Sequence, residues 1–305
     1  MKSCLLYISI AVALLPACAG SEDARKKESQ RTENRMNDDN LKLLQTSKDP
    51  KELVNAALSL ARSKQASDHE ALMKQLRSAD FLTRLDSEAD YRETRKRLRI
   101  YRVIDALKDN PAPSSRTVLL GLTESAVFLE EARRTDHLIK ASSVIKPPPS
   151  QLIKFWDKHS QPDDGFTPLT IGAMVENGAA PSMGLFEKKM ADMEHDEDAK
   201  LSWIRSSVLV HRDDLELLLS CERMLQGGMP SNLREPLIEV LFDYRPDDWF
   251  MPDRYYPQPP DRVKASPESL AQLRKIGQLA LKTVPLAERL KEVVEKTLED
   301  IEKKR

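Results

Sequence analysis

Apolar residues recur along most of this chain at spacings of three and four, the pattern of a helix that buries one face. Leu201, Ile204 and Val208 form one such series, and Leu215 and Leu218 belong to another. Polar or proline-containing turns separate these series into pieces of about 10 to 16 residues, a length that suits a helix better than a strand. The pattern predicts an all-α fold.

Clusters of turn-forming residues divide this pattern at nearly regular intervals of about 31 to 37 residues, as helical repeats do. A second set of polar loops lies about halfway between them, and Asp213 and Asp214 are suitable N-caps for the helix that follows. The period predicts an α-solenoid of helical hairpins over residues 49–250, with an irregular helical domain as the alternative. The main clusters occupy residues 109–113, 147–149, 177–181, 211–214 and 245–248, and the second set occupies residues 160–165, 194–198 and 227–232.

Aliphatic residues occupy comparable places just before successive turns. This arrangement resembles the second helix of HEAT or armadillo-type repeats, in which a basic residue follows an aliphatic one on the core-facing helix. The resemblance implies HEAT/ARM-like geometry, although the period is nearer that of tetratricopeptide repeats, whose Trp-Leu-Gly-Tyr and alanine pattern is missing. The segments that carry the resemblance are residues 102–104, 139–141, 171–173, 204–206 and 233–235.

The first residues have the layout of an export signal. Lys2 precedes an apolar run from Cys4 to Ala17. A helix of this length spans about 21 Å, which is short of the roughly 30 Å hydrocarbon core of a bilayer. We therefore expect a signal peptide over residues 1–18 and not a permanent membrane span.

The run ends in Leu15-Pro16-Ala17-Cys18, which resembles the lipobox of bacterial lipoproteins. The resemblance implies a diacylglyceryl group on Cys18, cleavage before it, and usually an acylated new amino terminus. Ala19 after the cysteine favours the outer membrane, facing the periplasm or the surface. Ala17-Cys18-Ala19 also fits ordinary signal peptidase, so a soluble secreted or periplasmic product is the alternative.

Residues 19–48 are rich in charged and amide side chains, with almost no aliphatic residues before Leu41. Such a segment buries too little apolar surface to offset its ordering entropy. The composition predicts a flexible tether between the anchor and the folded part.

The C-terminal part differs in character. Its first stretch, residues 242–256, is dense in aromatic side chains, and residues 251–265 form a proline- and aromatic-rich loop. We expect these rings either to cap the last repeat or to bind a partner protein. Residues 266–305 read as a long helix that Pro285 kinks or splits. The candidate interaction surface comprises Tyr244, Trp249, Phe250, Arg254, Tyr255 and Tyr256.

Charge and cysteine content exclude some classes of protein. The 48 basic and 49 acidic side chains nearly balance, which predicts no general attraction to nucleic acid. Once Cys4 is removed and Cys18 carries lipid, Cys221 alone remains, so core packing and not an intramolecular disulfide must hold the fold together.

The search for chemistry yields no recognisable active site, cofactor loop or metal motif. The five histidines form no zinc pair, and the acidic stretch 194–198 lacks the glycine of a calcium loop. We expect Ser182 to be an N-cap, since a nucleophile elbow requires a preceding strand. A compact pocket joining His159, Asp163 and His195 would favour an enzyme.

One basic cluster lies in residues 92–102 and includes Arg95, Arg97 and Arg99. These side chains either face solvent beside acidic neighbours or contact an anionic surface in the envelope. Taken together, the sequence favours a lipid-anchored envelope protein that acts as a non-catalytic scaffold or adaptor for a protein partner. An envelope enzyme or enzyme accessory, or a ligand-binding protein, is the alternative.

Overall fold

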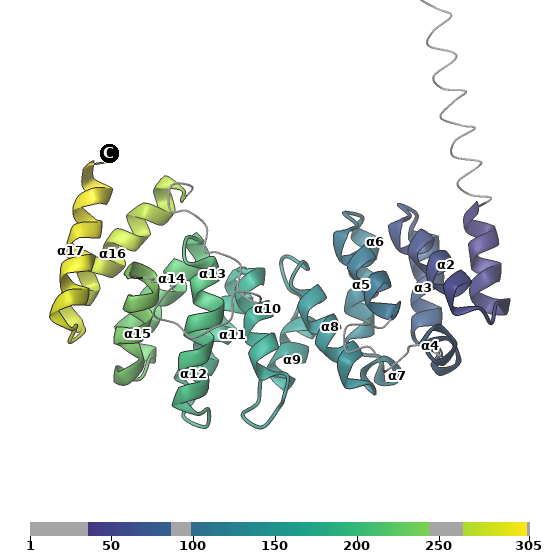
Figure 1. The fold of residues 1–305 in the computed structure, drawn as a ribbon, viewed down its shortest axis with the longest axis horizontal. Coiled ribbons are helices and arrows are strands. Elements are labelled where there is room, and N and C mark those ends of the chain that lie inside the picture. The colour runs from purple at the N-terminus through teal and green to yellow at the C-terminus, as the bar shows by residue number, and fades with distance from the viewer. Residues whose placement is uncertain (1–35, 87–98, 244–264, 304–305) are drawn as a thin grey trace, which may run out of the picture. The chain divides into compact units, whose positions relative to one another are not determined.

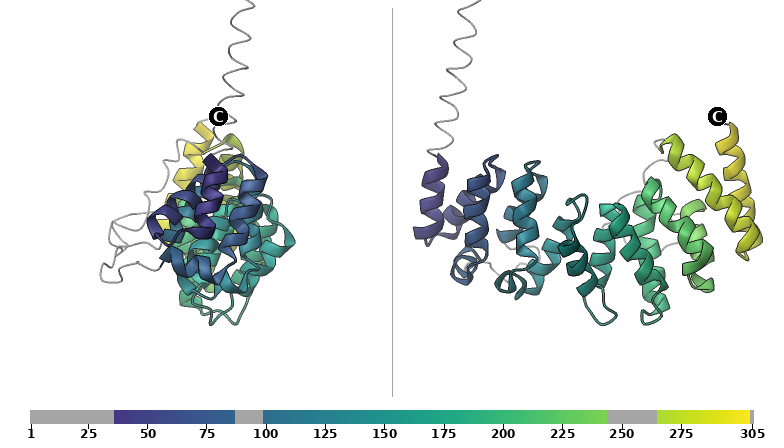
Figure 2. Two further views of the ribbon diagram at one scale, coloured as in Figure 1. Left: turned by 90° about the vertical axis from the view of Figure 1, so that its right-hand side faces the viewer. Right: turned by 180° about the vertical axis from the view of Figure 1, so that it is seen from behind.

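The computed structural model describes residues 36–86, 99–243 and 265–303, and this part of the chain consists of helices and turns without a strand (Figures 1 and 2). The all-α prediction is confirmed. The chain divides into two compact units, Met1–Val118 and Leu119–Arg305.

The first unit is built around α2 (Pro50–Arg62) and α5 (Arg99–Asp109). Their apolar faces, including Leu53 and Leu60 on α2 and Val103 and Leu107 on α5, are fully buried. Asp49 caps α2 by accepting a 2.8 Å hydrogen bond from the backbone N–H of Lys51. Besides a helix over residues 36–46, the helices of this unit are α2 (Pro50–Arg62), α3 (Ala66–Leu76), α4 (Ala79–Asp86), α5 (Arg99–Asp109) and the first part of α6 (Pro113–Leu122).

The predicted tether is wrong over residues 36–46, which form a helix. Leu44 is fully buried, and Asn37 donates a 2.6 Å hydrogen bond to the buried carboxylate of Asp68. The Arg84 guanidinium binds the carbonyls of Leu44 and Ser47 at 3.2 and 2.6 Å. Polar contacts therefore help Leu44 to hold this segment, and a count of aliphatic residues does not detect them.

The helices of the second unit pack on near neighbours in the chain. Helix α10 lies against α8 and α11, α14 lies against α11 and α16, and α16 lies against α17. The second unit also contains two π-helical segments. Its elements are α7 (Ala126–Leu129), α8 (Ala132–Ser142), α9 (Ser150–Lys158), α10 (Thr167–Asn177), α11 (Ala180–Ala191), α12 (Glu197–Trp203), the π-helical Ile204–Val208, α13 (Leu209–His211), α14 (Leu215–Arg223), the π-helical Met224–Gly228, α15 (Ser231–Phe242), α16 (Pro267–Thr283) and α17 (Glu288–Lys303).

The positions of most predicted turns are confirmed. Residues 110–112, 147–149, 178–179 and 212–214 lie between helices, and Asp214 caps α14 through the N–H groups of Glu216 and Leu217. The aliphatic residues placed before the five predicted turns are buried, as expected: Ile104, Ile139, Ile171, Ile204 and Leu233. The fifth of these turns, residues 245–248, lies outside the described residues.

The C-terminal segment is two helices that end and begin around Pro285, as the proline predicted. The two helices pack closely at Gly277 of α16. A Cβ atom at this position would lie 3.0 Å from Leu298 on α17 and 3.1 Å from Phe242 on α15. Small size at position 277 lets α16 approach α17.

An asparagine fastens the end of one helix to an earlier turn in each unit. Asn110, after α5, donates to the carbonyls of Ala61 and Ser63 at 2.8 and 2.7 Å, and its own carbonyl oxygen accepts from the N–H of Ala112. Both backbone carbonyls require a donor, and the N–H requires an acceptor, so the orientation of this amide is determined by its partners. We call this arrangement the Asn110 clamp.

The second unit repeats it. Asn177, the last residue of α10, donates to the carbonyls of Ser143 and Ile145 at 2.8 and 3.0 Å, and accepts from the N–H of Ala179. Ser182 is inside α11 and donates to the Asn177 side chain at 3.0 Å, so the prediction that it is an N-cap is wrong. We call this arrangement the Asn177 clamp.

Several predicted features lie outside the described residues. They are the signal peptide and Cys18, residues 19–35 of the tether, Arg95, Arg97, the loop over residues 251–264, and the six residues of the aromatic surface, Tyr244, Trp249, Phe250, Arg254, Tyr255 and Tyr256. Of the helices that the structure describes, none combines the length and the hydropathy needed to cross a bilayer.

Candidate functional site

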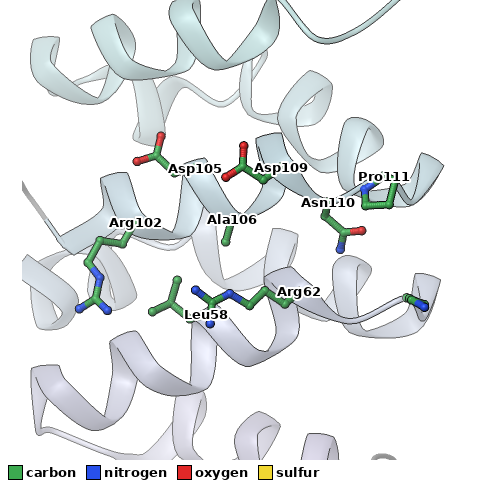
Figure 3. Close-up of a pocket in the computed structure, with 9 residues that line it drawn as sticks. Leu58, Arg62, Arg102, Asp105, Ala106, Asp109, Asn110 and Pro111 are labelled. Carbon is green, nitrogen blue, oxygen red and sulfur yellow. The ribbon is translucent and has the colours of Figure 1, made fainter.

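An open groove of about 440 Å³ lies between α2 and α5 in the first unit (Figure 3). Its floor contains the side chains of Leu58, Ala106 and Asn110, which are all at least nine-tenths buried. The complete lining is Leu58, Arg62, Lys64, Arg102, Asp105, Ala106, Asp109, Asn110 and Pro111.

The rim carries three exposed cationic side chains. Arg62 ends α2, Lys64 follows it, and Arg102 lies in the first turn of α5. Figure 3 shows the guanidinium groups of Arg62 and Arg102 on the side of α5 that faces Leu58. Within the described part of the first unit, none of the three cations forms an ion pair. Their charges are therefore available to a bound group.

Two carboxylates complete the rim. Asp105 and Asp109 are one turn apart on α5, and Figure 3 shows them pointing away from the two arginines. The groove thus separates its charges, with cations near the apolar floor and acids on the opposite side of α5. This arrangement suits an elongated ligand that presents different groups along its length.

A buried polar network supports the floor. Next to the Asn110 amide lies the ring of His69, and His69 Nδ1 is 2.6 Å from the Ser114 hydroxyl. Asp68 accepts hydrogen bonds from Ser63 and Asn37 at 2.5 and 2.6 Å. Burial lowers the pKa of His69, although a hydrogen bond to the Ala61 carbonyl and the charge of Asp68 oppose the shift. His69 is therefore neutral near pH 7.

A neutral imidazole that accepts from a serine hydroxyl is also one half of a nucleophile–base pair. The second ring nitrogen of His69 faces the Ala61 carbonyl at 3.4 Å, whereas the neighbouring carboxylate of Asp68 bonds to Ser63 and Asn37. His69 is only 1% exposed. These contacts point to a structural role, which holds α3 against the start of α6.

The second unit buries a separate group of titratable side chains around the loop between α11 and α12. Lys189 pairs with Asp157 at 2.9 Å, and Lys200 donates to the backbone carbonyl of Asp192. Both lysines are at most 2% exposed. His195 packs edge-on against Trp203, with ring centroids 5.1 Å apart.

Charges in this group act on one another. Burial lowers the pKa of His195 most, and the positive charges of Lys189 and Lys200 lower it further, while Asp192 opposes them. Burial also lowers the pKa of Lys200. Because these lysines are enclosed, we regard the group as internal support for the α11–α12 loop.

The residues that would favour an enzyme are not gathered into one cluster. His159 Nδ1 lies 3.2 Å from Asp164 and not beside Asp163, which is exposed. The His159 ring contacts Phe155 and Phe166, whereas His195 belongs to the lysine group.

The described residues contain little that would serve as a metal site or a reactive thiol. Over residues 36–86, 99–243 and 265–303, no three His, Cys, Asp or Glu side chains come close enough to hold a metal ion. Cys221 is fully buried, and this burial raises the pKa of its thiol to about 12. Cys221 is therefore an inert core residue.

Of the three arginines predicted to contact an anionic surface, the structure describes Arg99. It is half-buried at the start of α5 and donates to the Leu85 carbonyl at 3.1 Å. This contact ties α5 to the end of α4.

Comparison with protein-family models, curated proteins and solved structures found no match to this chain.

The groove was not predicted from the sequence, because its cations come from two helices that are distant in the chain. A recurring pattern, however, marks both clamps. Asn-x-Ala-x-x-Ser occurs as residues 110–115 and again as residues 177–182. Searching for such a repeat within the turn clusters would have identified Asn110 and Asn177.

Proposed function

We propose that this chain is a lipid-anchored adaptor of the bacterial envelope, whose folded part is an α-solenoid that holds a protein partner in the α2–α5 groove. The observation that carries the proposal is the groove itself, an apolar floor bordered by Arg62, Lys64 and Arg102, which form no ion pair with described residues. Solenoids expose grooves of this kind because each repeat contacts mainly its neighbours.

Two further observations support the repeat architecture. Helices in the second unit pack mainly on near neighbours in the chain, and the two clamps repeat one set of hydrogen bonds. Anchoring would follow from the lipobox at Cys18, since several acyl chains on one residue hold a protein stably at a bilayer.

Photo-crosslinking in living cells tests the adaptor. A photoreactive residue at Lys64, on the rim, is compared with one at Arg133, an exposed position on α8. We expect a discrete protein adduct from position 64 and none from position 133. Adducts that are identical at both positions, or with lipid alone, would contradict the proposal. A third position, Trp249, tests the aromatic surface.

The anchor is tested separately. Cys18→Ala should move the protein from the membrane fraction to the soluble fraction and abolish metabolic labelling with palmitate. Unchanged labelling would show that Cys18 carries no lipid.

A second candidate, an envelope hydrolase, is favoured only by the His69–Ser114 pair. A fluorophosphonate probe should label Ser114 if this pair activates it. The adaptor proposal predicts that the probe labels neither the unaltered chain nor the Ser114→Ala variant.

A further inference from the structure

We propose that the partner segment in the α2–α5 groove is an acidic peptide in which carboxylate side chains alternate with aliphatic ones. The inference rests on the proposed function and specifies the chemistry of the partner. It follows from the floor, the cations, the separation of charge and the rigidity of the groove.

The floor requires an apolar group. Leu58 and Ala106 face the groove at 6% and 9% exposure, and the open volume above them is about 440 Å³. An aliphatic side chain placed there would remove its own apolar surface, and that of Leu58 and Ala106, from water. A bare inorganic anion or a fully polar polymer would leave this surface wet.

The cations require anionic groups next to that apolar group. Arg62 and Arg102 lie on the side of α5 that faces Leu58, one on α2 and one on α5 (Figure 3). Guanidinium groups bind carboxylates with two parallel hydrogen bonds, and Lys64 adds a third positive charge to the lining. A peptide with carboxylates on both sides of an aliphatic residue satisfies the floor and both arginines together.

The separation of charge limits how far the acidic segment extends. Asp105 and Asp109 point to the other side of α5, so an anionic group that crossed α5 would meet like charge. The acidic segment is therefore expected to follow the space between α2 and α5 instead of crossing over α5. A broad anionic surface such as a bilayer would approach the carboxylates as well as the arginines.

Contacts within the chain hold the groove together. Asn110 is part of its floor and binds the carbonyls of Ala61 and Ser63, on either side of Arg62. This clamp fixes the end of α2 relative to the end of α5. Little ordering of the groove is then needed on binding, which favours affinity for a short peptide.

The test measures binding of synthetic peptides to the full chain in mild detergent by fluorescence anisotropy. The probe is a labelled peptide in which leucine alternates with glutamate. The first matched peptide has glutamine for glutamate, and the second has serine for leucine. We expect both matched peptides to bind at least tenfold more weakly than the probe.

Three substitutions locate the site. Arg62→Glu and Arg102→Glu should each weaken binding of the probe at least tenfold, whereas Arg133→Glu should leave it unchanged. All three positions are exposed, and circular dichroism and thermal unfolding confirm that each variant is folded. A peptide that carries lysine instead of glutamate should bind the Arg62→Glu/Arg102→Glu double variant more tightly than the unaltered chain.

Other results would overturn the inference. Equal binding of the glutamine peptide, or equal loss in Arg133→Glu, would show that the arginines do not recognise carboxylates. If the arginine variants no longer sediment with anionic vesicles but still bind the peptide as the unaltered chain does, the groove is a lipid site. A crosslinked partner at Lys64 without an acidic segment would leave the adaptor proposal intact and remove this inference alone.

Discussion

The Asn110 and Asn177 clamps perform the same task in different surroundings. Each asparagine donates to two carbonyls of an earlier turn, and each accepts from the N–H two residues ahead. The carbonyls lie 49 and 47 residues back in the first clamp, and 34 and 32 residues back in the second. The same contacts therefore tolerate a large difference in the length of the intervening chain.

The neighbours of the two clamps differ. His69 lies beside Asn110 and bonds to Ser114, whereas Pro181 occupies the position in the second clamp that Ser114 occupies in the first. Asn110 also lines the groove. The asparagine–carbonyl contacts are therefore common to both units, whereas the contacts with His69 and with the groove occur at Asn110 alone of the two asparagines.

The largest expected effect comes from removing the clamps. Asn110→Ala and Asn177→Ala should each lower the free energy of unfolding by about 2 to 4 kcal/mol, because each removes the asparagine donor from two backbone carbonyls and the acceptor from one backbone N–H. Hydrogen exchange measured by mass spectrometry should accelerate around residues 61–63 in the first variant and around residues 143–145 in the second.

Asn232→Ala is the matched control. Its amide bonds to Glu197 at the surface, so the change should stay within about 0.5 kcal/mol. If either clamp variant behaves like this control, that asparagine does not fasten its unit.

The second effect is a difference in how the stability around the two clamps depends on pH. The pKa of His69 is lowered by burial, so the unfolded chain binds the proton more readily and stability is lost as the pH falls below about 6.5. His69→Gln should reduce this loss by roughly 1 kcal/mol between pH 7 and pH 5, measured as local opening of α2 and α5 by hydrogen exchange.

The second unit provides the comparison for this prediction. The pKa values of His195 and His211 are lowered mainly by burial, so opening of α10 to α14 should keep its acid sensitivity in the His69→Gln variant. Equal acid sensitivity of the first unit with and without His69 would contradict the assignment.

The third effect concerns the residue after each asparagine. Gly178 has φ of 66°, in the left-handed region, whereas Pro111 follows Asn110. Gly178→Ala should lower the free energy of unfolding by about 1 kcal/mol through backbone strain, measured by urea denaturation.

The same substitution elsewhere should have the opposite sign. Gly184 is inside α11 with open space around it, so Gly184→Ala should raise stability by up to about 1 kcal/mol. A destabilised Gly184→Ala would mean that α11 is not a regular helix at this position.

The smallest effect is a difference in coupling. Ser182 donates to the Asn177 side chain, whereas Ser115 donates to the backbone carbonyl of Asn110. A double-mutant cycle of Asn177→Ala with Ser182→Ala should give about 0.5 to 1 kcal/mol of coupling. The cycle of Asn110→Ala with Ser115→Ala should give less, since the backbone acceptor remains.

Local patterns predicted much of the helical framework. The spacing of Ile171 and Ile204 identified buried positions, and Pro285 marked the division between α16 and α17. These signals lie within one helix or one turn. The helix at residues 36–46 was missed because Asn37 and Arg84 hold it through partners that lie elsewhere in the chain.

The candidate site depends on which helices become neighbours. Arg62 and Arg102 are ordinary exposed arginines in the sequence, and only the packing of α2 on α5 places them beside Leu58. His69 on α3 and Ser114 on α6 are likewise brought together only by the packing of helices that are distant in the chain. A helical period identifies the buried face of a helix, but it does not identify the helix that covers that face.

The Asn177 clamp also protects the chain against chemical ageing. Asparagine followed by glycine deamidates when the glycine nitrogen attacks the side-chain amide and forms a succinimide. In the folded protein the Gly178 N–H is bonded to the Met174 carbonyl and the Asn177 amide is held by two acceptors, so this attack is hindered. Asn110 precedes a proline, whose nitrogen carries no hydrogen to lose in that reaction. Each period of unfolding therefore exposes residue 177 to conversion into an aspartate. An aspartate cannot donate hydrogen bonds to the two carbonyls. Damage at the clamps would therefore accumulate in the second unit and not in the first.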